Sequence, residues 1–508
     1  MPNLISKDAL YGLEHFIQLR ALFNHISTQT TAFGVALSFA IVFYFVYYIL
    51  LHPLAHIPGP FFSKFSDIPY LLRFLSGYEY KHDYALFQRY GPVVRVGPNR
   101  VAVGEPEHVA TVYNKNAWKG DNYNLSQNYG IFGIKSAKDH AERKKMLTHP
   151  FLPVAVKSYD PIIQRNVDYF LDALQQTYAT RKGEPAKIFD FLQWPAFFSY
   201  DTLTELAFGE PMGFVQEQRD IGDMYQSFET ALYPIGAMIR VPSVFKFLKF
   251  TGIHDMMAPK PTDGNGVGVI LSFADTMIQK RIDNPSDKPD ILNKYLSSKY
   301  LLENRDILFK ELLLLIVAGT DTVAITIRAI LSNVLNDSRV NSHLLSLTPG
   351  SPGYRTYVSA CIKETLRLSP PGQMPFARVT PPHGHHFGDV LVPGGFQVYP
   401  SFYTINRCTR IWGPDANVFR PERWLGHLNG SEVWSHEKLR IMDLSFGVGP
   451  RMCLGKPVAE TELQLVIEGL WERFEFDGSH LDKIENVKVF NQMRFGSMPL
   501  GVRLRERI

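Results

Sequence analysis

The distribution of apolar residues sets an N-terminal segment apart from the rest of the chain. No Asp, Glu, Lys or Arg occurs between Ala21 and Ser63, and residues 31–51 are almost wholly apolar. A membrane-spanning helix needs about 20 such residues, so 31–51 is predicted to be a membrane anchor. A cleaved signal peptide is the alternative, but it would have a shorter apolar core nearer to the N-terminus.

This anchor fixes the expected domain division. Residues 1–30 are expected on the lumenal side, and 31–51 in the membrane. Residues 52–60 contain three prolines, which restrict the backbone, so they are expected to form a stiff linker. Residues 61–508 are expected to form one large domain. Lys and Arg are sparse on both sides of the apolar run, so charge alone does not set its orientation.

The remaining pattern predicts a mainly α fold with small β-sheets. Valines alternate with polar residues in VVRVGPNRVAVG, residues 93–104, which predicts a β-hairpin. Short strands are also expected between Pro382 and Pro400. Helical periodicity is expected in four stretches: 139–304 between Pro/Gly-containing loops, 304–337 as one long apolar helix, the helix carrying KETLRL (363–368), and 456–476.

Composition narrows the possible partners and the compartment. The chain has 53 Lys and Arg against 49 Asp and Glu, a formal net charge of +4. This is too small to indicate nucleic acid as a partner, so none is expected. The three cysteines, Cys361, Cys408 and Cys453, are odd in number and far apart. Reduced thiols in a reducing compartment are therefore expected rather than a disulfide framework.

Cys453 lies in an unusual setting, the stretch FGVGPRMCLG at residues 446–455. A thiolate is a strong ligand for iron. The glycines at 449 and 455 would let the backbone turn tightly and approach a planar cofactor. The following helix start would stabilise a sulfur anion. Arg451 suits a carboxylate such as a haem propionate, and Phe446 would shield the sulfur from water.

Cys453 has two other interpretations. A zinc site would need further Cys or His ligands at suitable spacing, and none is present nearby. A buried cysteine in a glycine-rich turn is common for an isolated cysteine, but it does not explain the complete spacing F-x-x-G-x-R-x-C-x-G.

FGVGPRMCLG resembles the haem-binding signature of the cytochromes P450, and the resemblance runs from about Pro58 to the C-terminus. It implies a P450 fold with an N-terminal transmembrane helix, in which 61–508 is the haem-binding catalytic domain. It also implies haem b as cofactor, with Cys453 as axial iron ligand and with Arg451, Phe446 and Gly455 at the cofactor.

The long apolar helix carries a second candidate motif, AGTDT at residues 318–322. Glycine weakens a helix, so Gly319 could open the helical ladder locally. Thr322 could pass on a proton that Asp321 supplies, and the resemblance implies this catalytic role for both residues. A polar patch between two helices is the other interpretation of the motif.

The KETLRL helix carries Glu364 and Arg367, which lie three residues apart and so on one helical face. In isolation they would be an ordinary surface ion pair. The resemblance implies that the pair is buried and structural, and that Arg423 of the segment FRPERWL joins it.

Haem propionate contacts are implied for Arg378 and His140. The family pattern has a basic residue four positions after His140. This chain has Lys144 there, with Arg143 one position early, so the assignment stays open between the two. Arg143 and Lys144, together with Lys145 and Lys456, are alternatively expected to form a basic patch for an acidic reductase.

The resemblance implies a haem–thiolate monooxygenase that takes electrons from NADPH through a separate NADPH–cytochrome P450 reductase. It is expected in the endoplasmic reticulum membrane, single-pass, with a cytosolic catalytic domain. A lipophilic small molecule is the expected substrate, because the stretches expected to face it are mostly apolar: 123–134, 214–250, 312–318, 370–376 and 495–498.

VRVGPNRVAV, FRPERWL and the spacing around GKPVAETE resemble microsomal enzymes of filamentous fungi that tailor secondary metabolites, which suggests a terpenoid, polyketide or alkaloid as the substrate. The alternatives are a reductase-independent isomerase or dehydratase, a haem-based sensor, and a structural membrane protein.

Overall fold

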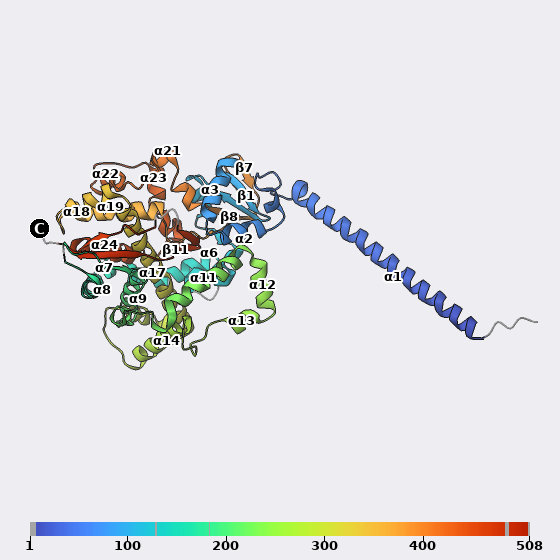
Figure 1. The fold of residues 1–508 in the computed structure, drawn as a ribbon, viewed down its shortest axis with the longest axis horizontal. Helices are drawn as coiled ribbons and strands as arrows, with labels where there is room; N and C mark the ends of the chain where they lie inside the picture. The colour runs from blue at the N-terminus through green and yellow to red at the C-terminus, as the bar shows by residue number, and fades with distance from the viewer. Residues whose placement is uncertain (1–6, 127–129, 182, 483–486, 506–508) are drawn as a thin grey trace, which may run out of the picture.

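The computed structural model describes residues 7–126, 130–181, 183–482 and 487–505. Figure 1 shows a single long helix that projects from a mainly helical domain. Residues 1–6 of the expected lumenal segment lie outside the described residues. So do 127–129, 182, 483–486 and 506–508 of the expected catalytic domain. The mainly α fold with small sheets, predicted from the sequence, is confirmed.

The projecting helix is longer than the predicted anchor. α1 runs over Lys7–Val46 and continues as one π-turn, η1, over Tyr47–Leu51. Its stretch Gln18–Leu51 is long and apolar enough to cross a membrane, and 0% of its most apolar window is buried in the protein. α17, Arg305–Leu335, also meets this test, but 67% of its window is buried inside the domain. α17 is therefore a core helix.

Residues 52–60 are packed into the domain rather than extended away from it. The fully buried Arg95 donates hydrogen bonds to the carbonyls of Tyr48 and Leu54, both at 3.3 Å, and lies 3.1 Å from Nδ1 of His52. A Cβ on Gly59 would lie 2.1 Å from the Arg95 carbonyl oxygen. One guanidinium thus joins the end of the projecting helix to the segment that follows it.

Helices form most of the domain, and α17 lies at its centre against α9, α19 and α24. The long helix, the KETLRL helix and the helix after Cys453 all occur where the sequence predicts them. The helices of the domain are α2 Ile68–Leu75, α3 Glu79–Tyr90, α4 His108–Val112, α5 Gly130–Gly133, α6 Ala137–Leu147, α7 Pro153–Lys157, α8 Asp160–Tyr178, α9 Trp194–Phe208, α10 Phe214–Glu217, α11 Met224–Arg240, α12 Pro242–Phe250, α13 Ile253–Met257, α14 Val267–Asp283, α15 Ile291–Leu296, α16 Lys299–Glu303, α17 Arg305–Leu335, α18 Ser338–Ser346, α19 Pro352–Leu368, α20 Phe402–Ile405, α21 Thr409–Trp412, α22 Leu425–Leu428, α23 His436–Ile441 and α24 Lys456–Arg473.

Short 3₁₀ turns connect several of these helices. They are η2 Phe61–Lys64, η3 Asp121–Ser126, η4 His149–Phe151, η5 Ile221–Asp223, η6 Pro421–Trp424, η7 Leu444–Phe446 and η8 Gly449–Arg451. Local sequence explains where two of the helices that carry predicted site residues begin. Ser351 caps α19 by accepting from the Tyr354 amide, and Pro352 takes its first position. Ser136 caps α6 in the same way, accepting from the Asp139 amide.

The strands form small sheets at the edges of the helical body. They are β1 Val93–Gly97, β2 Arg100–Val103, β3 Trp118–Lys119, β4 Ile188–Asp190, β5 Arg378–Val379, β6 His385–Phe387, β7 Val390–Val392, β8 Gln397–Pro400, β9 Phe474–Asp477, β10 Lys488–Phe490, β11 Gln492–Arg494 and β12 Pro499–Leu504. The largest sheet has the order β1-β2-β8-β5-β3. Its antiparallel β1–β2 pair, with Val93 opposite Val103, confirms the predicted hairpin.

The last long helix is shorter than the sequence predicts. α24 ends at Arg473 rather than at residue 476, because Phe474–Asp477 forms β9. β9 pairs with β12, so that Phe474 lies opposite Leu504 and Phe476 opposite Val502. Strand pairing with residues near the end of the chain thus overrides the local helical pattern.

Glu462 on α24 is a buried carboxyl that has no hydrogen-bond partner among the described residues. It is fully buried, and neither carboxyl oxygen has a hydrogen-bond partner among the described residues. Burial raises the pKa of Glu462 from 4.5 to about 8. Between these pH values only the unfolded chain loses the proton, so the free energy of unfolding should fall by about 1.4 kcal/mol per pH unit.

We expect Glu462→Gln to remove this dependence, because the amide does not ionise. Unfolding of both proteins followed by circular dichroism between about pH 5 and pH 7.5 measures the difference. The variant should gain stability relative to the wild type as the pH rises. Equal pH dependence in the two proteins would contradict a buried, protonated carboxyl.

Candidate functional site

A cavity of about 370 Å³ lies inside the domain, and most of the predicted site residues line it. α17 contributes Leu314, Leu315, Ala318 and Gly319 to its wall. Other lining residues come from distant parts of the sequence: Tyr113, Tyr123, Ile131, Phe132, Leu147, Phe151, Tyr295, Pro371, Gly372, Phe376 and Phe402. The wall is predominantly apolar.

The expected substrate-facing stretches are only partly represented in this wall. Residues from 123–134, 312–318 and 370–376 line the cavity, although residues 127–129 lie outside the described part of the chain. No described residue of 214–250 or 495–498 lines it. Phe214, for example, is fully buried and stacks on Tyr200 of α9, with ring centroids 4.7 Å apart.

Cys453 reaches the cavity from the loop between η8 and α24. Its backbone amide donates to the Phe446 carbonyl at 2.8 Å, which closes the loop. Burial raises the pKa of the Cys453 thiol, whereas hydrogen bonds from the amides of Gly455 and Lys456 act in the opposite direction. The start of α24 therefore favours the thiolate, as the sequence suggests.

The glycines of this loop have different roles. Gly447 and Gly449 have positive φ angles of 79° and 74°, which other residues adopt at a cost. A Cβ on Gly449 would also lie 2.4 Å from the Tyr113 carbonyl oxygen. Gly455 differs from the expectation of a tight turn, since its φ is an ordinary −76°. A Cβ there would lie 3.8 Å from the Cys453 sulfur, an ordinary contact, so the described protein atoms do not require glycine.

Basic side chains surround one part of the cavity. Lys119, His140, Arg378 and Arg451 line it, and all except Arg451 are at least nine-tenths buried. Among the described lining residues, the only carboxyl is that of Glu311. The Nε of Arg378 is buried without a hydrogen-bond partner in the described chain. A buried cationic cluster with an unused donor fits a ligand that brings its own carboxylates, such as haem.

The two arginines have several backbone partners. Arg451 donates to the carbonyls of Ile134 and Lys135, both at 2.8 Å. Arg378 donates to the Phe376 carbonyl at 3.0 Å, and its guanidinium carbon lies 4.7 Å from the centre of the Tyr113 ring. These contacts hold both guanidinium groups at the cavity.

The cluster disfavours additional positive charge. Burial, followed by the charges of Arg451, Lys119, Lys144 and Arg378, lowers the pKa of His140 to about 3, so its imidazole is neutral near pH 7. Burial and the charges of Arg378 and Arg451 hold the pKa of Lys119 well below its ordinary value. Bound carboxylates would relieve this mutual repulsion. Lys119 was not singled out from the sequence, because nothing in its local pattern marks it.

Arg143 and Lys144 lie in different environments. Lys144 lines the cavity, and its ammonium donates to the Pro450 carbonyl at 2.7 Å. Arg143 instead forms an ion pair with Glu311 at 2.7 Å. Lys456 is paired with Asp443 at 2.6 Å. The suggested basic patch thus has two members that are neutralised within the domain, while Lys145 is exposed.

The AGTDT motif forms part of an unbroken helix. α17 is continuous through Gly319, so the expected opening of the ladder is absent there. A Cβ on Gly319 would lie 2.4 Å from Leu203 of α9, so glycine permits close helix packing. Thr322 lines the cavity, and its hydroxyl donates to the Ala318 carbonyl at 2.8 Å.

Asp321 is not among the residues that line the cavity. Its side chain is buried, and Oδ2 has no hydrogen-bond partner in the described chain. Burial raises the pKa of Asp321 to about 6, and the charge of Arg328 acts in the opposite direction. A carboxyl of this kind can exchange a proton near neutral pH.

Glu364, Arg367 and Arg423 form one buried charge network, as the resemblance implies. Glu364 accepts two hydrogen bonds from Arg367 and one from Nε of Arg423, each at 2.8 Å. The Trp424 indole donates to Glu364 as well, at 2.9 Å. Arg367 also donates to the carbonyls of Asn406 and Ala416. The network joins α19 to η6 and to the loop that precedes η6.

Comparison with known proteins agrees with this arrangement. Residues 68–346 and 351–504 match the family model of cytochrome P450. The chain is 29% identical to the cytochrome P450 monooxygenase cfoH of Aspergillus candidus, over 94% of this chain and 93% of the relative. It is 27% identical to the cytochrome P450 monooxygenase pkfB of Emericella nidulans, over 94% and 98%.

A third relative is the cytochrome P450 monooxygenase asR2 of Sarocladium schorii, which is 27% identical over 89% of this chain and 93% of its own length. The family model covers most of the domain, including both the cysteine loop and the Glu364 network. The chain therefore belongs to the cytochrome P450 family and is a P450 monooxygenase.

Proposed function

We propose that this monooxygenase inserts one oxygen atom from dioxygen into a lipophilic small molecule in a secondary-metabolic pathway. The apolar wall of the 370 Å³ cavity carries the proposal, because most of the described lining residues are apolar and the basic ones are only Lys119, His140, Lys144, Arg378 and Arg451. A substrate that contacts the α17 wall would meet Leu314, Leu315 and Ala318. Such a surface favours aliphatic or aromatic molecules over charged ones.

Haem b is the proposed cofactor, with Cys453 as its axial iron ligand. Arg378, Arg451 and His140 would hold its propionates, and Lys119 and Lys144 would add positive charge nearby. Phe446 and Gly455 would lie against it. When bound, haem supplies the redox chemistry of oxygen activation. The chain supplies the thiolate, the counter-charges and the shape of the substrate cavity.

Proton delivery is assigned to Asp321 and Thr322. Thr322 lines the cavity, and Asp321 precedes it with a pKa raised to about 6. A carboxyl that supplies protons is effective below its pKa, so turnover should fall as the pH rises through about 6. Asp321→Asn should abolish this fall and lower turnover roughly 10²-fold.

The pH dependence of turnover for both proteins, measured with the substrate identified below, checks this prediction. Asp306→Asn is a matched control, since Asp306 is on the same helix with its side chain 93% exposed. A wild-type profile without a step near pH 6 would contradict the role of Asp321.

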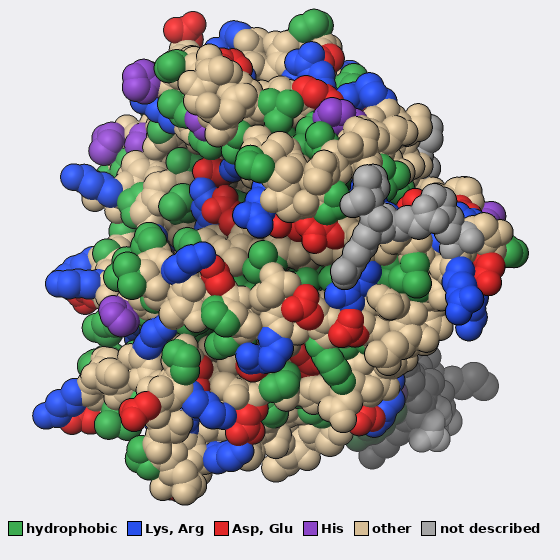
Figure 2. Space-filling view, turned by 90° about the vertical axis from the view of Figure 1, so that its left-hand side faces the viewer, with side chains coloured by type: hydrophobic (Ala, Val, Ile, Leu, Met, Phe, Trp, Pro, Cys, Tyr) green, Lys and Arg blue, Asp and Glu red, His purple; other side chains and the backbone are tan. Residues whose placement is uncertain are grey.

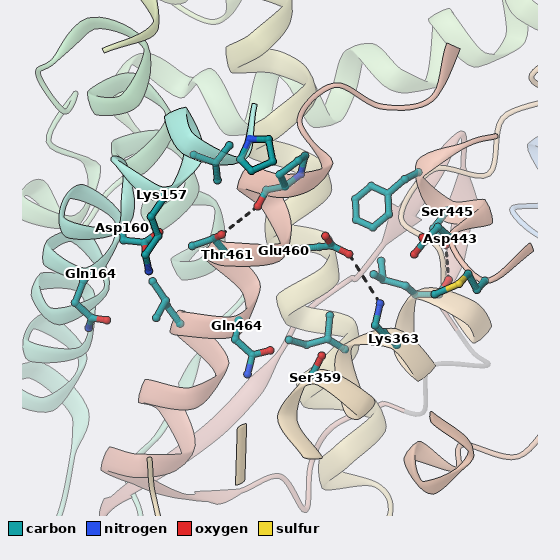
Figure 3. Close-up of a pocket in the computed structure, with 18 of the residues that line it drawn as sticks. Lys157, Asp160, Gln164, Ser359, Lys363, Asp443, Ser445, Glu460, Thr461 and Gln464 are labelled. Atoms are coloured by element: carbon teal, nitrogen blue, oxygen red, sulfur yellow. Dashed lines mark hydrogen bonds and ion pairs between the residues drawn. The ribbon is translucent and has the colours of Figure 1, made fainter. Parts of the chain in front are cut away.

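NADPH–cytochrome P450 reductase is the proposed electron donor. A hollow of about 920 Å³ between α7, α8, α19 and α24 shares Phe446 with the cavity wall. Figure 3 shows Lys363 and Glu460 pointing toward each other in its lining, and the two form an ion pair at 3.9 Å. A donor docked over this hollow would lie next to the cysteine loop.

The face in Figure 2, which points away from the anchor, has basic and acidic side chains intermixed.

The endoplasmic reticulum is the proposed location, with a single-pass anchor and a cytosolic domain. Large exposed apolar side chains occur on the side of the domain from which α1 departs, where Figure 1 places α2, α12 and α13. They include Phe61, Phe62, Ile68, Leu72, Phe247, Phe250, Met256 and Met257. An apolar surface beside a membrane anchor favours contact with lipid.

A metabolite comparison tests the proposed function. The gene would be disrupted in its host, and mass spectrometry would identify what accumulates and what disappears. We expect the lost compound to equal the accumulated one plus an oxygen atom. Compounds of equal mass would instead support a reductase-independent isomerase. The residues Asp321 and Thr322 argue against that alternative, because such enzymes often lack this acid–threonine pair.

A further inference from the structure

The short helix α5, Gly130–Gly133, forms part of the cavity wall. Its residues Ile131 and Phe132 both line the cavity. A helix of four residues has too few internal hydrogen bonds to be stable alone. Its position must therefore depend on contacts with the rest of the protein.

Glu311 of α17 makes a direct contact with α5. It is 4% exposed, and its Oε2 accepts a hydrogen bond from the Ile131 amide at 2.9 Å. The other oxygen, Oε1, accepts from Nη1 of Arg143 at 2.7 Å. One carboxylate thus joins α5 to α17 and, through Arg143, to α6.

The approach of α5 to Glu311 requires glycine at position 130. Gly130 has a positive φ of 43°, and a Cβ there would lie 2.5 Å from Oε2 of Glu311. The other end of the turn is also held by a buried polar side chain. Lys119 donates to the Phe132 carbonyl, and its ammonium lies 4.6 Å from the centre of the Phe132 ring.

We propose that Glu311, with Arg143 as its counter-charge, is a positioning residue that fixes Ile131 and Phe132 in the cavity wall and so limits the size of the ligand that the cavity admits. The charge on Arg143 is what allows a carboxylate to be buried beside an apolar cavity. This proposal rests on the proposed function only in taking the cavity as the ligand site.

The test uses the haem-loaded, full-length protein with Glu311→Ala and Glu311→Gln. Asp306→Asn is the control because it removes an exposed carboxylate from α17 that is not among the described residues lining the cavity. Hydrogen exchange at the Ile131 amide reports directly on the contact with Glu311. Dissociation constants of imidazole and of the much larger 1-(triphenylmethyl)imidazole, from absorption titrations, report on the cavity wall.

In Glu311→Ala, exchange at Ile131 should be at least about ten-fold faster. The affinity for the large imidazole should rise about ten-fold relative to that for imidazole, because the wall can retreat. Glu311→Gln should give an exchange rate and an affinity ratio between those of the wild type and Glu311→Ala. Its amide oxygen still accepts a hydrogen bond from Ile131, but it does not form an ion pair with Arg143. Asp306→Asn should match the wild type.

Unchanged exchange at Ile131, or an unchanged or lower affinity ratio, would overturn the proposal. If Glu311→Ala does not retain haem, the same criteria apply to Glu311→Gln. A wild-type protein that binds neither imidazole would contradict the proposed haem function instead. The exchange measurement would then still decide whether Glu311 holds α5.

Discussion

Cys453→Ser should abolish the haem–thiolate spectrum and leave no detectable monooxygenase activity. The serine hydroxyl is a far weaker base and electron donor than a thiolate, so it cannot replace the sulfur ligand. The fold should survive, because the Cys453 contact that closes the loop is made by its backbone amide with Phe446. The measurement is the difference spectrum of the reduced protein with carbon monoxide.

Cys408→Ser is the matched control for this substitution. Cys408 is half-buried, and it is not among the described residues that line the cavity. Its replacement should leave both spectrum and activity unchanged. A normal spectrum in Cys453→Ser would contradict the assignment of Cys453 as ligand, whatever the activity of the variant.

Glu364→Ala should destabilise the domain by about 3–5 kcal/mol, the usual cost of breaking a buried ion pair. The substitution leaves Arg367 and Arg423 buried at 3% and 8% exposure without their shared carboxylate. Chemical unfolding followed by circular dichroism measures the loss. Because the network lies between α19 and η6, we also expect a lower haem content in the variant.

An exposed pair provides the comparison. Glu303 and Lys299 are four residues apart on α16, with side chains 60% and 87% exposed, so Glu303→Ala should change stability by less than about 0.5 kcal/mol. Similar effects of Glu303→Ala and Glu364→Ala would contradict the importance of the buried network.

The Glu364 network also predicts acid sensitivity. Burial alone would raise the pKa of Glu364, but the hydrogen bonds and charges of Arg367 and Arg423 outweigh it and lower the pKa below 4.5. A carboxyl with a lowered pKa stabilises the folded state at neutral pH. This contribution should be lost as the pH falls below 4.5.

Local patterns in the sequence were sufficient for much of the fold. The β1–β2 hairpin follows from alternating valines around Gly97-Pro98-Asn99, and α17 follows from a long apolar run. The end of α24 could not be obtained in this way, because β9 depends on pairing with β12 near the end of the chain.

The site was predictable where a motif has a fixed spacing. The cysteine loop is such a motif, and the structure places Cys453 at the cavity. Arg143 and Lys144 could not be distinguished, because they are adjacent and both basic. Their difference arises from Glu311, which is 168 residues from Arg143 in the sequence. The role of Glu311 could not be predicted from the sequence, because a single carboxylate on a long helix is usually solvent-exposed.

Gly319 shows how a residue can be singled out for the wrong reason. Its low helix propensity suggested a break in α17, but the helix continues through it. The requirement for glycine comes from Leu203 on α9, more than one hundred positions earlier in the chain. Propensity is a property of the residue alone, whereas this requirement depends on a neighbouring helix.

In the proposed membrane-anchored state, the attachment of residues 52–60 by Arg95 would couple the orientation of the domain to the tilt of α1. A transmembrane helix changes its tilt when the thickness of the bilayer changes. Because residues 52–60 are held against the domain, a change in the tilt of the helix would rotate the domain about its attachment point. In that proposed state, lipid composition would set how deeply the exposed apolar side chains of α12 and α13 enter the bilayer.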